Sequence, residues 1–180
     1  MQNPKLPFAI NNVISPLVII AFAVVLRLLP HPPNVAPIAA MALFGGVYLN
    51  KKYALIVPLV SLFISDFFLG FYASMSYVYC SFLLTGLIGI WLRNHKSFTN
   101  IILASLISST LFFLITNFGF FLTTDLYPKT FSGQMEAYIM ALPFFRNTLL
   151  GDLGFVGLFF GSYELIFSVV KHNMSLAKSH

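Results

Sequence analysis

The stretch IILASLISSTLFFLITNFGFFL, from Ile101 to Leu122, decides the fold of this chain. It contains no Asp, Glu, Lys or Arg, and it matches the run of roughly 20 apolar residues that an α-helix needs to cross a bilayer. The whole chain has 180 residues, of which 58% are hydrophobic and 8% are charged, and its mean hydropathy is +0.88. A soluble domain carries about 25% charged residues. We therefore expect an integral membrane protein.

Similar apolar segments along the rest of the chain predict an all-α protein with six transmembrane helices. The predicted spans cover approximately residues 13–29, 35–49, 53–72, 77–92, 101–122 and 149–170. The stretch 135–145 is too short to span and contains Glu136, which favours a short surface helix between the fifth and sixth spans. Little of the chain lies outside these segments, so we expect one transmembrane domain over residues 1–180.

The distribution of basic residues predicts the orientation in the membrane. Alternate threading of the six spans places most of them on one side: Lys5, Lys51, Lys52, Arg93, Lys96, Lys171 and Lys178. The other side receives Arg27, Lys129 and Arg146. Cytoplasmic loops carry an excess of Lys and Arg. We therefore expect both termini in the cytoplasm and the protein in the inner membrane of the cell.

Polar residues gather at the predicted non-cytoplasmic ends of the spans, which suggests a binding cavity open to the outside. They are Arg27, His31, Asn34, Asp66, Tyr72, Tyr77, Tyr79, Asn117, Asp125, Arg146, Asn147 and Asp152. An ionisable group inside a membrane costs roughly 3 kcal/mol or more unless it is paired or hydrated. Asp66 therefore needs Arg27 or Arg146, either as a structural ion pair or as part of a ligand site. Glu164, near the middle of the last predicted span, has no evident partner.

Other chemistries have little support in the sequence. The single cysteine excludes an intrachain disulfide and a CxxC site. The sequence contains no GxGxxG or Walker pattern with which the protein itself would bind a nucleotide to drive transport. No basic run with interleaved aromatic residues predicts nucleic-acid binding. On a helix, Cys80 shares a face with Tyr77. Its thiol is either a small apolar group or a soft metal ligand, and composition leaves both readings open.

A set of short motifs between Arg27 and about Gly161 resembles a known family of small membrane proteins. The motifs are RLLPHPPN (27–34), ALFGG (42–46), SDFFLG (65–70), TNFG (116–119), YPKT (127–130), PFFRN (143–147) and GD (151–152). Together they are similar to the substrate-binding S components of energy-coupling factor (ECF) vitamin transporters. The segment YVYCSF (77–82) further resembles the BtuM members, which handle cobalamin and ligate its cobalt through a cysteine near the outer end of a transmembrane helix.

The resemblance implies a substrate-binding domain for the uptake of cobalamin or a related corrinoid, bound from the outer side with the Cys80 thiolate as axial cobalt ligand. Cobalamin would be the bound substrate, and no cofactor of the protein's own is expected. The implied pocket members are Asp66, Tyr77, Tyr79, Arg146, His31 and Asn117. With cyanocobalamin the thiolate would displace cyanide, so Cys80 would carry a single-turnover decyanation and is the one candidate catalytic residue.

The expected partners are cobalamin, the lipid bilayer and the ECF transmembrane and ATPase subunits. S components dock on that module through an AxxxA surface of the first helix, whereas the first span here has Ala21 and Ala23 at a different spacing. Solitary operation therefore stays open beside use of the module. Three rival functions remain: an S component for another vitamin or small molecule with a structural Cys80, a membrane-embedded enzyme acting on a lipid, and a structural subunit.

Overall fold

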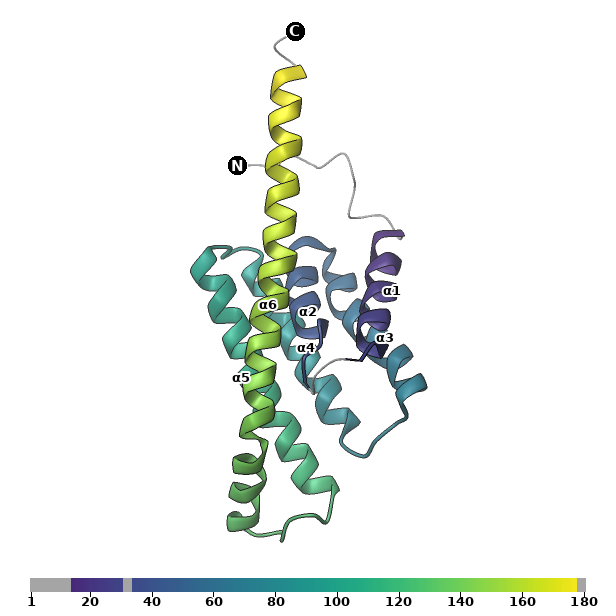
Figure 1. The fold of residues 1–180 in the computed structure, drawn as a ribbon, viewed down its shortest axis with the longest axis vertical. Coiled ribbons are helices and arrows are strands. Elements are labelled where there is room, and N and C mark those ends of the chain that lie inside the picture. Colours follow the sequence, from purple (N-terminus) through teal and green to yellow (C-terminus); the bar gives the residue numbers. More distant parts are fainter. Residues whose placement is uncertain (1–13, 31–33, 178–180) are drawn as a thin grey trace.

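The computed structural model describes residues 14–30 and 34–177, and within these ranges it contains helices and no strands (Figure 1). The helices are α1 (Ile14–Leu28), α2 (Ile38–Tyr48), α3 (Lys51–Leu69), α4 (Met75–Leu92), α5 (Phe98–Thr123) and α6 (Phe131–Ala177). The predicted all-α class is confirmed for these ranges. Four helices, α3 to α6, are long and apolar enough to cross a membrane. Because α1 and α2 have only 15 and 11 residues, six full spans stay a prediction.

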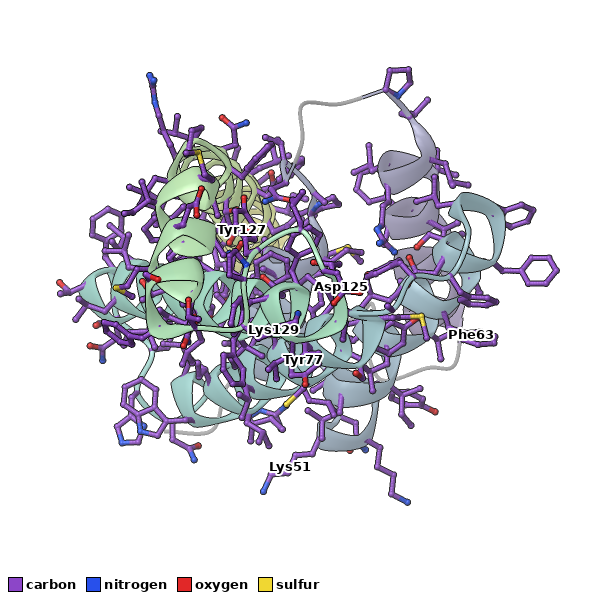
Figure 2. The ribbon with its side chains drawn as sticks, turned by 90° about the horizontal axis from the view of Figure 1, so that it is seen from below. Lys51, Phe63, Tyr77, Asp125, Tyr127 and Lys129 are labelled. Atoms are coloured by element: carbon purple, nitrogen blue, oxygen red, sulfur yellow. The ribbon has the colours of Figure 1, made fainter. Side chains whose placement is uncertain are left out.

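The surface of the described residues carries large apolar side chains, as a lipid-facing surface does. Phe63 of α3 points away from the bundle, as seen from below in Figure 2, and is 55% exposed. Phe98 and Phe131, at the first residues of α5 and α6, are more exposed still. Monomeric soluble proteins rarely expose apolar patches of this extent. The surface is therefore compatible with a membrane environment.

α6 differs from the prediction because it is one continuous helix of 47 residues. It begins at Phe131, where the Thr130 hydroxyl accepts a hydrogen bond from the Gly133 backbone N–H at 3.2 Å, as N-terminal capping residues do. It continues through Pro143. Proline inside a helix removes one backbone hydrogen bond and can kink the helix without ending it. The predicted separate helix at 135–145 is therefore wrong, and the predicted start of the last span at 149 lies within α6.

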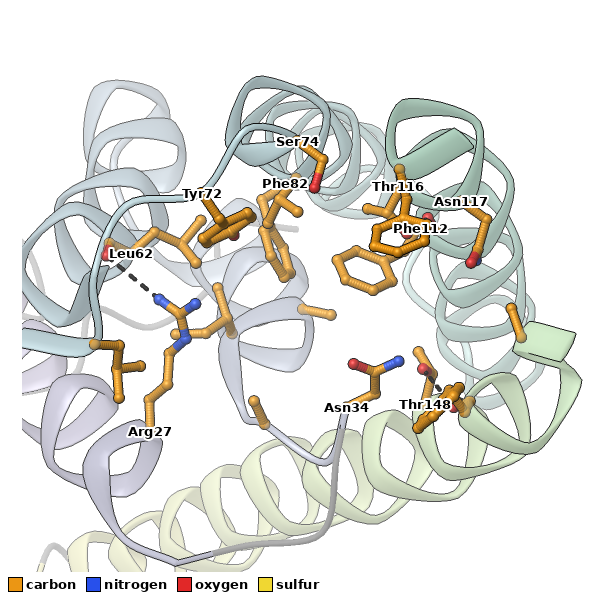
Figure 3. Close-up of a pocket in the computed structure, with 18 of the residues that line it drawn as sticks. Arg27, Asn34, Leu62, Tyr72, Ser74, Phe82, Phe112, Thr116, Asn117 and Thr148 are labelled. Atoms are coloured by element: carbon orange, nitrogen blue, oxygen red, sulfur yellow. Dashed lines mark hydrogen bonds between the residues drawn. The ribbon is translucent and has the colours of Figure 1, made fainter. Parts of the chain in front are cut away.

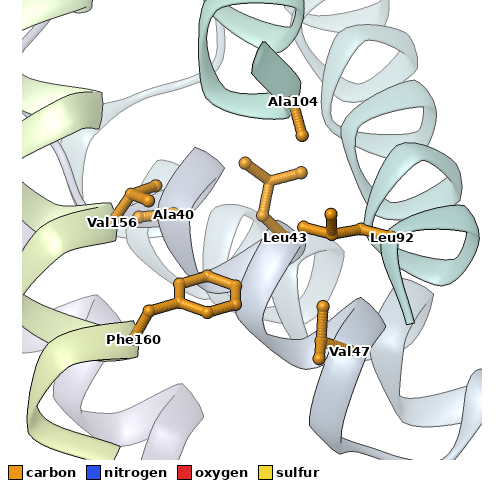
Figure 4. Close-up of a cluster of buried hydrophobic side chains, with 7 residues drawn as sticks. All are labelled: Ala40, Leu43, Val47, Leu92, Ala104, Val156 and Phe160. Carbon is orange, nitrogen blue, oxygen red and sulfur yellow. The ribbon is translucent and has the colours of Figure 1, made fainter. Parts of the chain in front are cut away.

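The short helix α2 occupies the centre of the bundle, where α3, α4, α5 and α6 pack around it. Leu43 and Val47 of α2 belong to a buried cluster with side chains from α4, α5 and α6 (Figure 4). α2 and α4 approach so closely at Gly46 and Gly89 that a Cβ atom on Gly46 would lie 2.3 Å from the Gly89 carbonyl carbon. Such contacts between small residues let helices pack tightly in membranes. There, the removal of apolar side chains from water supplies no driving force for helix association.

Charged side chains fasten the end of the bundle where α2 and α4 end. Arg93 Nε donates to the Gly46 carbonyl at 2.9 Å and its Nη2 to the Leu49 carbonyl, which satisfies free carbonyls at the C-terminus of α2. Glu164 of α6 accepts a hydrogen bond from Tyr48 Oη at 2.8 Å and forms an ion pair with Lys96. Glu164 thus has two partners, which corrects the expectation from the sequence.

α6 extends beyond the other helices at this end (Figure 1). Lys96, the partner of Glu164, lies in the connection between α4 and α5, so Glu164 marks the edge of the bundle. The remaining residues 165–177 add roughly 20 Å of helix at 1.5 Å per residue. The packed part of α6 is therefore its first two thirds, and the opposite end of the bundle holds the candidate site.

Candidate functional site

A cavity of about 890 Å³ lies at the end of the bundle where α1, α3 and α5 end and α2 and α4 begin (Figure 3). All six helices and the connections that follow α1, α3 and α5 contribute to its lining. Figure 2 shows the molecule from this side, with Asp125, Tyr127 and Lys129 on the connection between α5 and α6. Ligand pockets typically measure about 300–1,000 Å³. The cavity lies where the sequence predicted a concentration of polar residues.

Arg27 forms one polar corner of the cavity and is held by α3. Its Nη2 lies 2.8 Å from Asp66 Oδ1, and its Nη1 donates to the Ser65 hydroxyl and, at 3.3 Å, to the Leu62 carbonyl. Asp66 is fully buried, and Tyr79 Oη donates to its second oxygen at 3.0 Å. Asp66 therefore finds the cationic partner that the sequence required. It lies behind Arg27, which itself lines the cavity.

Asp152 of α6 is a second buried carboxylate, and this one lines the cavity directly. It is 4% exposed, and its Oδ2 accepts a hydrogen bond from Ser109 Oγ of α5 at 2.6 Å. Arg27 and Asp152 are the charged residues among those that line the cavity in the described part of the chain. Because Asp66 balances Arg27, Asp152 is the acidic residue of the lining that has no ionic partner among the described residues.

Two amides and a phenol add polar groups to the lining. Asn34, just before α2, has a φ of 63°, in the left-handed region that asparagine tolerates, and its side chain points into the space between the helices in Figure 3. Asn117 Nδ2 donates to the Phe113 carbonyl at 2.7 Å. Burial raises the pKa of Tyr72, and the nearby Asp66 raises it further. The phenol of Tyr72 therefore remains protonated at neutral pH.

Aromatic side chains form the apolar walls. The rings of Phe82 and Phe112 lie 5.2 Å apart between centroids, on α4 and α5, and Phe120 and Phe144 complete the set. Aromatic rings in the wall of a site stack on flat, ring-containing molecules, and their faces also attract cations. The arrangement of a largely apolar wall with a few convergent polar groups is typical of small-molecule sites.

The residues predicted for the pocket are only partly brought together. Asn117 lines the cavity, and Asp66 and Tyr79 stand behind Arg27. Tyr77 packs instead against Gly119, where an added Cβ would lie 2.2 Å from the Tyr77 ring. Arg146 is exposed and does not line the cavity, whereas His31 lies outside the described residues.

Cys80 is exposed and does not line the cavity. Ser74, which precedes α4, and Val78 and Phe82 of α4 line the cavity at intervals of four residues, along one face. Cys80 is two residues from both Val78 and Phe82, so it projects about 200° around the helix from that face at 3.6 residues per turn. The thiol therefore lies on the side of α4 that faces away from the cavity.

Asn34, Tyr72 and Asp152 were recognised from the sequence as polar residues at this end, but not as pocket members. The signal that selected Asp66, an acid within an apolar segment, applies equally to Asp152. Ser109 carried no such signal, because serine is common in membrane helices. Within the described residues, no group of three or more His, Cys, Asp and Glu side chains is placed to hold a metal ion.

A model described as a family of unknown function, DUF6580, covers residues 8–175. No curated protein and no solved structure matches the chain.

Proposed function

The chain belongs to DUF6580, a family of unknown function, and we propose that it is a membrane protein that binds a small organic molecule in the cavity as the first step of uptake. The observation that carries this proposal is the cavity of about 890 Å³ itself, with an apolar wall and a few convergent polar groups. The resemblance to the S components of vitamin transporters supports uptake as the purpose of binding.

The proposed side of entry is the non-cytoplasmic side. Lys51, Lys52, Arg93 and Lys96 lie at the end of the bundle opposite the cavity. The cavity end has fewer basic residues, and the excess of Lys and Arg marks the cytoplasmic side of a membrane protein. This distribution supports an inner-membrane location with both termini in the cytoplasm and the cavity facing outward.

The substrate class that the geometry favours is a small molecule bound without a cobalt–thiolate bond. A corrinoid held by Cys80 requires that thiol at the cavity, whereas Cys80 lies on another face of α4. The two substrate classes are separated by the visible spectrum of purified protein incubated with cyanocobalamin. We expect the cyano spectrum to stay unchanged in wild type and in Cys80→Ala; a change in wild type alone would restore the corrinoid proposal with its decyanation.

A lipid-modifying enzyme is less well supported, because the acids it would use are held apart. Asp66 is paired with Arg27, and Asp152 is bonded to Ser109. Asp125 is fully exposed, 4.0 Å from Lys129. Paired carboxylates that hold a metal and a pyrophosphate need to converge on one point, and these three do not.

Docking on an ECF module has no support from α1. Ala21 is exposed whereas Ala23 is fully buried, so the two alanines do not form one small-residue surface. We therefore propose a role for this chain in the binding step. The energy for transport would come from a partner or from the concentration gradient of the bound molecule.

Filling the cavity tests the proposal. Ala141 lies on the cavity wall of α6 and is 6% exposed, whereas Leu150 of the same helix is 61% exposed and outside the lining. Wild type, Ala141→Phe and the matched control Leu150→Phe are purified from membranes, and bound small molecules are extracted and identified by mass spectrometry. We expect one molecule to accompany wild type and the control and to be depleted at least about tenfold in Ala141→Phe. Equal recovery from all three proteins would contradict binding in the cavity.

A further inference from the structure

We propose that the molecule bound in the cavity is an organic cation, a ring-containing amine or nitrogen heterocycle whose positive group pairs with Asp152. This inference rests on the proposed function, because it assigns the chemistry of the occupant of the same cavity.

Asp152 differs from the ion-paired acids of the described chain. Asp66 lies 2.8 Å from Arg27, Asp125 lies 4.0 Å from Lys129, and Glu164 pairs with Lys96. Asp152 makes no ion pair within residues 14–30 and 34–177, although it is only 4% exposed. Buried charges in proteins are normally paired, and an acid inside a membrane domain without a partner marks a functional site.

Within the part of the chain that the structure describes, the one hydrogen-bond donor to Asp152 is Ser109, and this donor is itself shared. Ser109 Oγ lies 2.6 Å from Asp152 Oδ2 and 3.0 Å from the carbonyl of Ser105. A hydroxyl has one proton to donate, so it satisfies either the carboxylate or the carbonyl, not both at once. The carboxylate therefore keeps acceptor capacity on the cavity wall that the described residues do not fill.

Arg27 does not supply the missing positive charge. Its guanidinium is bonded to Asp66, Ser65 and the Leu62 carbonyl, all on α3. Among the described residues that line the cavity, the carboxyl group of Asp152 is therefore the ionisable group that has no ionic partner. An anionic occupant would meet this charge in a largely apolar space where it is poorly screened.

The remaining lining suits a flat cation. Phe82 and Phe112 line the cavity, and the faces of aromatic rings attract positive charge as well as other rings. The amides of Asn34 and Asn117 offer both donors and acceptors to ring substituents. An amine or a protonated or quaternary heterocycle satisfies the carboxylate and the aromatic wall together.

The rival explanation is that Asp152 and Ser109 only tie α6 to α5. In that case both Asp152→Asn and Ser109→Ala would lower the unfolding temperature of the empty protein, and neither would change a preference among ligands. Under our proposal Asp152→Asn removes the preference for cations, whereas Ser109→Ala retains it because the carboxylate remains.

The experiment measures dissociation constants of wild type, Asp152→Asn and Ser109→Ala in nanodiscs, with unfolding of the empty proteins as a check on folding. The probes are thiamine and pyridoxamine as cations, pyridoxine as the neutral match of pyridoxamine, and riboflavin, biotin and cyanocobalamin. We expect wild type and Ser109→Ala to prefer a cationic probe, and Asp152→Asn to bind that probe roughly 10- to 100-fold more weakly, as expected for loss of a charge-assisted bond.

The outcomes separate the two proposals. Preference of wild type for a neutral or anionic probe, or an unchanged cation affinity in Asp152→Asn, would overturn the role of Asp152 while binding in the cavity stands. If no probe binds, the molecule extracted from wild type tests whether the occupant is a cation. An extracted molecule without a nitrogen that is positive at neutral pH would overturn the inference. Absence of both a bound probe and an extracted molecule would overturn the proposed function itself.

Discussion

At the scale of single residues, Asp66 and Asp152 are buried carboxylates with opposite surroundings. Asp66 has its charge balanced by Arg27 at 2.8 Å and accepts a second bond from Tyr79. Among the described residues, Asp152 has the shared hydroxyl of Ser109 and no ionic partner. The first arrangement serves the stability of the fold, and the second serves a molecule that enters the cavity.

The Arg27–Asp66 pair gives a stability prediction. In Arg27→Met the buried carboxylate of Asp66 loses its cation, so we expect the free energy of unfolding to fall by roughly 3–5 kcal/mol. The double variant Arg27→Met with Asp66→Leu removes both charges and should recover most of that loss. Chemical unfolding in detergent measures both; an Arg27→Met protein as stable as wild type would refute the assignment.

The Lys96–Glu164 pair gives the contrasting prediction. Its side chains are 37% and 51% exposed, so solvent screens their attraction. We expect Glu164→Gln to lower the free energy of unfolding by about 1 kcal/mol or less. The same unfolding assay checks this value, and a loss as large as that of Arg27→Met would show that Glu164 is held in a less hydrated site than its exposure indicates.

At the scale of elements, the crossing of α2 and α4 depends on two glycines. A methyl group on Gly46 would lie 2.3 Å from the Gly89 carbonyl carbon, and both atoms belong to packed backbone. We expect Gly46→Ala to destabilise the protein by more than roughly 2 kcal/mol, because overpacking forces the helices apart. Thermal unfolding of the purified protein measures the change.

Gly157 of α6 provides the matched control. An added Cβ there meets no atom within 4 Å, and alanine favours a helix over glycine by about 1 kcal/mol. Gly157→Ala should therefore be neutral or slightly stabilising. If both alanine substitutions had equal effects, the close approach of α2 and α4 would not be the reason that Gly46 is required.

The sequence predicted five of the six helices to within a few residues, because long apolar runs separated by polar or proline-rich connections leave little freedom in their placement. It failed at α6, where Glu136 and Pro143 suggested a break. An exposed Glu136 on the first turns carries little cost, and Pro143 lies inside a helix that neighbouring helices hold in place. Tertiary packing, and not the local sequence pattern, therefore determines that α6 is one continuous helix.

The sequence predicted the end of the bundle at which the candidate site lies, but of the residues predicted for the pocket only Asn117 lines the cavity in the described part of the chain. Polar residues at the span ends located the cavity, because polar groups avoid lipid. Which residues face inward depends on the rotation of each helix, and a helix that is apolar all round does not reveal its rotation. This is why Cys80 was assigned to the pocket while Val78 and Phe82, two residues away on α4, line it.

At the scale of the whole molecule, we propose that the cavity opens at the outer face of the membrane. In a Cys80→Ser background, a new cysteine at Asp125, on the connection beside the cavity, should react with a membrane-impermeant maleimide in intact cells. A cysteine at His95, on the connection at the opposite end, should react only after the cells are opened. The reverse pattern would place the cavity at the cytoplasmic face.

The most direct test of the central claim is the native mass spectrum of the protein released from nanodiscs. The account predicts that wild type carries the added mass of one small molecule per chain, and that Ala141→Phe, whose cavity is filled, appears at the mass of the bare chain. A wild-type spectrum with the bare mass alone, or an adduct that Ala141→Phe retains in full, would contradict binding in this cavity.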